Sequence, residues 1–427
     1  MLGAFVSAFK APDLRRKLLF TFSIMALFRL GSVMPTPGTS TRAINACLKT
    51  AQNSSTFGLV NLISGGALLH LSVFALGIMP YITSSIIMQL LTVVIPRLER
   101  LHQEGESGNQ KITQYTRYVT IGLAVLQSTV FVSLARAGRL IGNCTGLVPD
   151  SSVIRVGTIV LTMTAGTATI MWLGELITDR GIGNGMSLLI FTSIASRLPA
   201  EGGRILASTS GFIFSIVMLL GLVIVIGVIA IEQSQRRIPV QYAKRMIGRR
   251  QYGGTQTYIP MKVNQAGVIP VIFASSLLYL PQLIGQVTSN LTVRNFIANY
   301  LTKGDHPAYM LLYTLLIIFF AYFYTAITFN TVEISDNMKK YGGFIPGIRP
   351  GRPTAEYLDY ILNRITLPGA LFLSLITVGP FTLLSLTKQN AFPFGGTAVL
   401  IMVGVGLETV KQIESQLMMR NYEGFLR

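Results

Sequence analysis

The sequence predicts an all-α membrane protein that crosses the bilayer about ten times. Half of the 427 residues are hydrophobic and only 12% are charged, whereas a soluble domain carries about 25% charged residues. Apolar segments of about 20 residues, the length that spans the hydrocarbon core as a helix, recur along the chain. No long stretch lacks such a segment, so the sequence predicts no separate soluble domain.

Hydropathy places the ten predicted spans at regular intervals. The fifth is short and interrupted by polar residues, and the tenth ends in charged residues. The spans are 18–36, 74–95, 114–135, 154–176, 184–199, 211–232, 264–285, 308–330, 365–386 and 394–411.

Basic residues fix the orientation of these spans. An even number of spans places both termini on one side, and that side receives 24 of the 35 Lys and Arg residues. The opposite side receives ten, and Arg29 falls inside the first span. Cytoplasmic loops collect Lys and Arg, so we expect both termini in the cytoplasm. This topology explains the net charge of +18 without nucleic acid.

The stretch 75–96 is long enough to span, yet it carries Pro80, polar residues and Gln89. Proline inside a membrane helix needs neighbours or a cavity that satisfy the freed carbonyl. Ile78 and Ile82 lie four residues apart, on one helix face. We therefore expect this helix to face protein or water on the side of the two isoleucines.

The apolar segment 57–70 is too short to span and contains the pair Gly65-Gly66. A short segment of this kind either re-enters the membrane from outside or forms an external loop helix. Spacing alone leaves both interpretations open.

Two predicted cytoplasmic loops, 233–263 and 331–364, are strongly basic. The first has alternating apolar residues around Ile238, which predicts a β-hairpin with basic ends. The second contains GGFIPGIRPGRPT, whose glycines and prolines predict a rigid turn around Arg349 and Arg352. Such loops satisfy the positive-inside rule or bind anionic lipid, and stiff arginine-bearing loops also suit docking to acidic or phosphate groups.

No motif indicates an enzyme, a cofactor or a metal site. Proton- or ion-coupled transporters usually need an acid or base within the membrane. The predicted spans contain almost no ionisable groups; Arg29 is the exception, and we expect it to snorkel. Cys47 and Cys144 both fall on the external side. We expect two free thiols, with a disulfide between them as the alternative.

Several long motifs of this sequence resemble those of the SecY family, whose members form the centre of the bacterial protein-conducting channel. The motifs occur in the family's order over nearly the whole chain. They are GIMPYITSSIIMQLLTVV (77–94), GESGNQKITQYTRY (105–118), MWLGELITDRGIGNGMSLLIF (171–191), QRRIPVQYAKR (235–245), NQAGVIPVIFASSLL (264–278), FIPGIRPGRPT (344–354) and FGGTAVLI (394–401).

The resemblance implies ten helices in two inverted-repeat halves around an hourglass pore, with a short re-entrant plug helix. The halves would be 1–196 and 211–427, joined by an external hinge loop at 197–210. The plug maps to about 57–70, including Phe57, Asn61, Leu62, Gly65 and Gly66. An apolar ring closes the pore and maps to Ile78, Ile82, Ile190, Ile272 and Ile401.

The resemblance also implies docking and gating residues. Motor or ribosome binding maps to the basic loops, with Arg349 foremost and with Arg236, Arg237, Lys244, Arg245 and Arg352. A lateral gate, where helices 2 and 3 face helices 7 and 8, would include Thr83, Gln89, Gln127 and Asn264.

The implied function is a passive, non-enzymatic channel for unfolded secretory chains and apolar membrane segments. The implied partners are SecE, SecG, the SecA motor, the ribosome, substrates with signal sequences, SecDF, YidC and anionic lipids, at the bacterial cell membrane. The alternative is a secondary transporter of a small solute with inverted repeats; the scarcity of ionisable groups in the spans and the basic loops argue against it.

Overall fold

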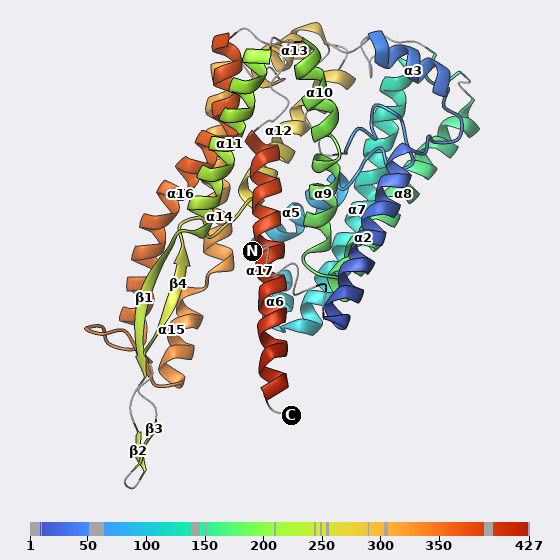
Figure 1. Cartoon of the computed structure of the whole chain (residues 1–427). Helices are drawn as coiled ribbons and strands as arrows, with labels where there is room; N and C mark the ends of the chain where they lie inside the picture. Colours follow the sequence, from blue (N-terminus) through green and yellow to red (C-terminus); the bar gives the residue numbers. More distant parts are fainter. Residues whose placement is uncertain are drawn as a thin grey trace. The chain divides into compact units, whose positions relative to one another are not determined.

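The computed structural model describes residue 9 and the ranges 11–50, 64–138, 146–149, 152–208, 211–242, 245–247, 250–252, 256–288, 290–302, 306–387 and 396–425. These ranges are mostly helical (Figure 1). The chain divides into two compact units, which we describe separately. Unit 1 comprises Met1–Phe214, Leu278–Lys303 and Ile401–Arg427, and unit 2 comprises Ser215–Leu277 and Gly304–Leu400.

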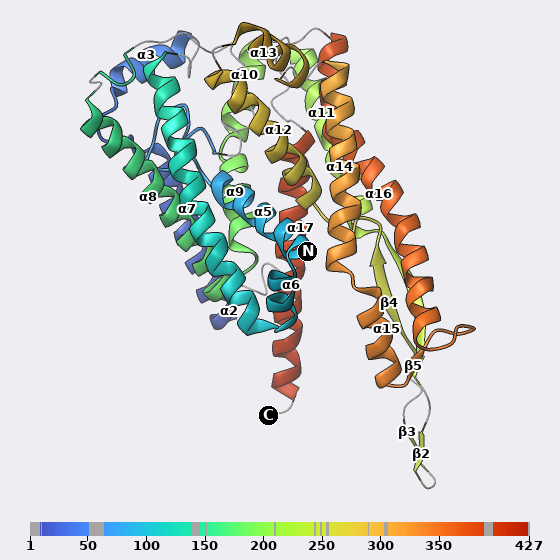
Figure 2. The ribbon, with the colours of Figure 1, turned by 180° about the vertical axis from the view of Figure 1, so that it is seen from behind.

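Unit 1 is built around packed helices. Its elements are α2 (Pro12–Val33), α3 (Thr41–Thr50), α5 (Met79–Val94), α6 (Pro96–Gln103), α7 (Glu106–Arg136), α8 (Val153–Arg180), α9 (Gly185–Ala195), α10 (Leu198–Ser208), α13 (Leu291–Phe296) and the π-helix η1 (Ile297–Thr302). Helix α5 packs against α7, and α7 packs against α8 (Figure 2). Three helices contribute residues to both units: α11 (Gly211–Gln233), α12 (Ile269–Val287) and α17 (Gly396–Phe425).

Unit 2 combines helices with a small sheet. The helices are α14 (Pro307–Thr328), α15 (Thr331–Lys340) and α16 (Arg352–Thr387). The strands are β1 (Gln235–Tyr242), β2 (Arg245–Ile247), β3 (Arg250–Tyr252), β4 (Gln256–Lys262) and β5 (Gly343–Phe344). Strands β4, β1 and β5 form one antiparallel sheet in that order, and β2 pairs with β3.

Each of the ten predicted spans contains a helix. Among the described residues, six helices are long and apolar enough to cross a membrane, or seven if the bent pair α5 and α6 is one span. These two helices meet at 98°, where Pro96 begins α6. Helices α7, α16 and α17 extend beyond the predicted spans, so Arg352 starts a helix and does not lie in the turn with Arg349. The count of ten spans stays a prediction.

The predicted second span, 74–95, is helical only from Met79. Pro80 therefore lies in the first turn of α5, where its missing N–H would have had no helical partner. The expectation that Pro80 lies inside the helix and frees a carbonyl there is wrong. The residues before it, 64–78, form consecutive turns.

The turn segment 64–78 lies in the core of unit 1. Leu68, Leu71 and Leu76 are at most 1% exposed and cluster with residues of α7 and α8. Main-chain hydrogen bonds join the segment to the residues that follow α2. The Val73 N–H donates to the Met34 carbonyl at 2.9 Å, and Pro35 and Ser72 form an isolated antiparallel β-bridge. Burial and hydrogen bonding therefore fix the start of α5.

Candidate functional site

The pore-ring isoleucines of unit 1 are all buried. Ile78 directly precedes α5, Ile82 lies one turn into it, and the Ile82 N–H donates to the Ile78 carbonyl at 3.1 Å. Ile190 lies on α9 and Ile401 on α17, and none of the four is more than 8% exposed. Ile272 lies on α12 in unit 2 and is half-buried. The one-turn spacing of Ile78 and Ile82 is confirmed, and the ring of five stays a prediction.

The predicted plug falls partly on described residues. Phe57, Asn61 and Leu62 lie outside them. The described part, 64–70, is a turn and not a helix, because Gly65 and Gly66 adopt positive φ angles of 64° and 90°, which right-handed helices exclude.

Arg29, which the sequence predicts to snorkel, has a partner within the protein. Its Nη1 donates to the carbonyl of Gly65 at 2.9 Å, so the guanidinium of α2 holds the turn segment. Partial burial, followed by the charges of Arg197 and Arg29, lowers the pKa of the His70 imidazole. Sequence reasoning missed this contact because α2 and the turn are 36 residues apart.

The two basic loops come together in unit 2. The predicted β-hairpin is confirmed: β1 pairs with β4, with Ile238 opposite Ile259. Strand β5, from the second basic loop, pairs with the other edge of β1, with Gln241 opposite Phe344. Figure 1 shows these strands extending alongside α15. No alternation pattern in the sequence predicts β5, because it is only two residues long.

Alternation along β1 separates a packing face from an exposed face. Ile238 and Val240 are buried in a cluster with residues of α15 and α16, while Arg237, on the opposite face, is exposed. Arg236 is on the same face as Ile238 but is also exposed, near the start of the strand. The Arg237 guanidinium lies 4.8 Å from the centre of the Tyr258 ring, a cation–π contact. Strand β1 therefore presents exposed arginines while its apolar side chains pack against α15 and α16.

The PGIRPG turn is held by backbone contacts and presents Arg349 to solvent. The Thr354 hydroxyl donates to the Arg349 carbonyl at 2.8 Å, and the Ser335 hydroxyl donates to the Gly351 carbonyl at 2.6 Å. Arg352, also exposed, pairs with Glu356 on the same helix at 3.0 Å. Lys244 lies outside the described residues, and the Arg245 backbone lies in β2.

The predicted gate residues have different environments. The Thr83 hydroxyl donates to the Met79 carbonyl at 2.9 Å, Gln89 is exposed, and Gln127 is buried on α7. Asn264 is 4% exposed, and its amide donates to Glu232 Oε1 at 2.6 Å and to the Gly267 carbonyl. These contacts lie within one unit each, so the gate assignment stays a prediction.

Sequence reasoning missed two polar links inside unit 1. The Ser84 hydroxyl on α5 donates to the Thr116 carbonyl on α7 at 2.7 Å, and Arg117 pairs with Glu175 of α8 at 2.8 Å. For the Ser84 link, small polar residues spaced along apolar helices were the available signal, because such residues form hydrogen bonds between membrane helices.

Cys47, on α3, is disulfide-bonded, and there is no free cysteine in the described part of the chain. The expectation of a free thiol is therefore wrong for Cys47. The other cysteine of the chain, Cys144, lies outside the described residues.

Comparison with known proteins places this architecture in one family. The SecY family model matches residues 72–410. The chain is 60% identical over 437 residues to the protein translocase subunit SecY of Streptomyces galbus, and both chains are covered completely. It is 58% identical to the Mycobacterium bovis protein of the same name, again over both full lengths.

The chain belongs to the SecY family. It is accordingly a multi-pass membrane protein. Solved structures of channels share the fold: one described as a protein-conducting channel has a TM-score of 0.66 at 19% identity and covers 93% of this chain and 91% of its own. Sec61 from a canine ribosome-channel complex has a TM-score of 0.64 at 18% identity and covers the same shares. No comparison supports the solute-transporter alternative.

Proposed function

We propose that this chain is the pore-forming subunit of a protein translocase. It passes unfolded secretory polypeptides across the membrane and releases hydrophobic segments sideways into lipid. The observation that carries the proposal is the match to translocase subunits at about 60% identity over the full length, together with the fold of a protein-conducting channel. A channel subunit of this kind is not itself an enzyme.

The seal is proposed to be the five isoleucines Ile78, Ile82, Ile190, Ile272 and Ile401. A β-branched side chain has few χ1 states, so such a ring has a defined shape. An apolar constriction excludes water and ions by dewetting, and its walls offer no hydrogen bond that would hold a passing chain. The burial of Ile78, Ile82, Ile190 and Ile401 supports a packed, dry position in the resting protein.

The lateral gate is proposed to open between α5 and α7 on one side and α12 and α14 on the other. An apolar segment leaving through it gains about 25 cal/mol for each Å² of apolar surface removed from water. Thr83, Gln89, Gln127 and Asn264 are the proposed polar residues that tune how readily the gate parts.

The energy for transport is proposed to come from partners. The SecA motor or a translating ribosome would dock on the arginine platform, formed by Arg236, Arg237, Arg349 and Arg352, and Lys244 and Arg245 are further proposed docking residues. Exposed guanidinium groups on stiff turns suit carboxylate and phosphate partners. One structural neighbour is Sec61 in a ribosome-channel complex, which supports ribosome docking.

The proposed setting is the bacterial cell membrane, with both termini in the cytoplasm and with SecE and SecG as small partner subunits. SecDF, YidC and anionic lipids complete the expected partners. The halves 1–196 and 211–427 are proposed to hinge at 197–210, a segment that contains helix α10.

A stalled secretory chain tests the proposal directly. A photo-crosslinking residue at Ile82 is expected to capture the chain during transport. The same probe at Leu126 on α7, which is 65% exposed and is expected to face lipid, should not capture a polar secretory chain. Equal labelling at both positions, or solute uptake by the purified complex without any capture at Ile82, would contradict the channel assignment.

A further inference from the structure

Arg29 is an unusual residue for its position. Helix α2 is an apolar helix in which a charged side chain is costly unless it is paired. Arg29 is half-buried, and its Nη1 donates to the Gly65 carbonyl at 2.9 Å. A charged donor on a carbonyl makes a stronger hydrogen bond than a neutral one. The contact therefore fastens the turn segment 64–78 to α2.

A second arginine, between α9 and α10, approaches the same turn. Arg197 lies two residues after the end of α9, and a Cβ built on Gly66 would lie 2.4 Å from its Nη2. The guanidinium is therefore in direct contact with the Gly66 backbone. The charges of Arg197 and Arg29 both act on His70 four residues later, which agrees with two guanidinium groups gathered at this turn.

The turn has room for glycine only. Gly65 and Gly66 both adopt left-handed backbone angles, which L side chains rarely adopt. A Cβ on Gly65 would also lie 3.2 Å from the Ser193 Cα of α9 and 3.4 Å from Arg29 Nη1. The Gly65 backbone thus lies between the main chain of α9 and the Arg29 side chain.

We propose that Arg29 and Arg197 form an arginine clamp that holds the Gly65–Gly66 turn against α2 and α9 in the resting channel. The turn leads through the buried residues 67–77 to Ile78, so the clamp positions the segment that enters the proposed seal. This inference rests on the proposed channel function. Both arginines are positioning residues: they hold the backbone and do not contact the transported chain at rest.

The clamp is reversible because of its chemistry. When the turn moves away, the Arg29 guanidinium exchanges the Gly65 carbonyl for water and keeps its charge solvated. Removing one charge-assisted hydrogen bond shifts such an equilibrium by about tenfold to a hundredfold. Arginine suits this role better than lysine, because its planar fork presents five N–H donors in a fixed geometry.

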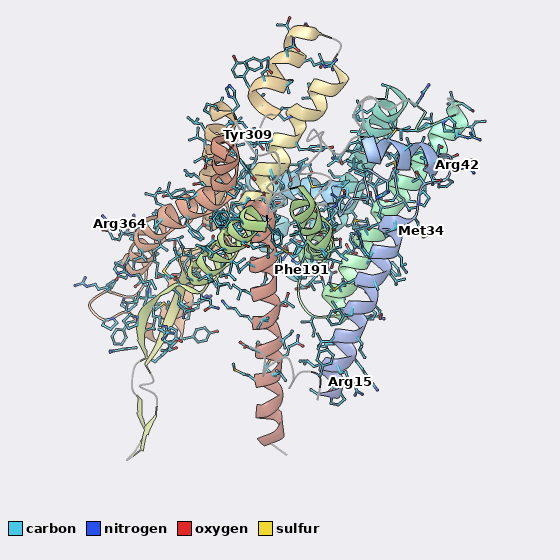
Figure 3. All side chains as sticks on the ribbon, turned by 45° about the horizontal axis from the view of Figure 1, so that its top comes forward. Arg15, Met34, Arg42, Phe191, Tyr309 and Arg364 are labelled. Atoms are coloured by element: carbon cyan, nitrogen blue, oxygen red, sulfur yellow. The ribbon has the colours of Figure 1, made fainter. Side chains whose placement is uncertain are left out.

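Resting ion conductance of the full translocase complex in planar bilayers tests the clamp. Arg29→Met is expected to raise the resting open probability at least about tenfold, and Arg29→Lys, which keeps the charge but not the fork, should raise it less. Arg42→Met is the matched control: it removes the same charge from an exposed position on α3 (Figure 3) and should leave the resting conductance at the wild-type level.

Arg197→Met, which lies after the end of α9, decides the question if Arg29→Met fails to assemble. It is expected to raise resting conductance and to speed hydrogen exchange of the amides in 64–78. Wild-type conductance and exchange in assembled Arg197→Met and Arg29→Lys complexes would overturn the clamp. If the wild-type complex transported no preprotein at all, the proposed function itself would be refuted. Failure of the clamp and failure of the channel function are therefore distinguishable.

Discussion

Gly166 on α8 offers a direct test of how the turn segment is seated. A Cβ built at this position would lie 2.0 Å from the carbonyl oxygen of Val73. Real Cβ atoms essentially never approach a neighbour closer than 3.0 Å, so Gly166→Ala must push the carbonyl away by about 1 Å in a close-packed interior. Val73 has little freedom to move, because its N–H is bonded to the Met34 carbonyl.

The expected cost is that of overpacking a well-packed site, about 1–3 kcal/mol. The apparent midpoint of thermal unfolding of the purified complex should therefore fall. The resting conductance should rise as well, because the displaced segment leads to Ile78. Both effects follow from one backbone contact.

Gly157→Ala provides the control on the same helix. A Cβ at Gly157 meets nothing within 4 Å, and alanine favours a helix over glycine by up to about 1 kcal/mol. This variant should unfold at the wild-type temperature or above. Equal midpoints for the two alanine variants would refute the close approach of α8 to the turn segment.

Three further predictions address the seal, the platform and the disulfide. Replacing Ile78 and Ile82 together by Ser should raise ion leakage, because hydroxyls stabilise water in the constriction; an unchanged membrane conductance would count against the seal. Arg349→Glu should abolish motor-driven secretion while the chain still inserts into the membrane, whereas Arg364→Glu, on the exposed face of α16, should secrete normally; normal secretion by both would exclude the docking role. Maleimide labelling of the denatured wild-type chain should require reductant because Cys47 is disulfide-bonded, and full labelling without reductant would contradict the bond.

Residue pattern alone predicted the class of this protein and most of its helices. Runs of about 20 apolar residues identify spans because the bilayer, not a distant neighbour, is their main solvent. The hairpin followed from alternation around Ile238 for a similar reason, since one face of β1 packs and the other is solvated. Long motifs in a fixed order then indicated the family, which composition alone could not identify.

The tertiary structure decided what lies beside what within each unit. The helix of 75–96 begins only at Met79 because the preceding residues are fixed by contacts with Met34, Pro35 and α8, all distant in sequence. Arg29 was an isolated charge in the sequence and became a hydrogen-bond donor to Gly65 once the chain was folded. Strand β5 forms only because its two residues pair with the edge of β1. Local sequence cannot specify such contacts, because each depends on backbone atoms brought together from separate parts of the chain.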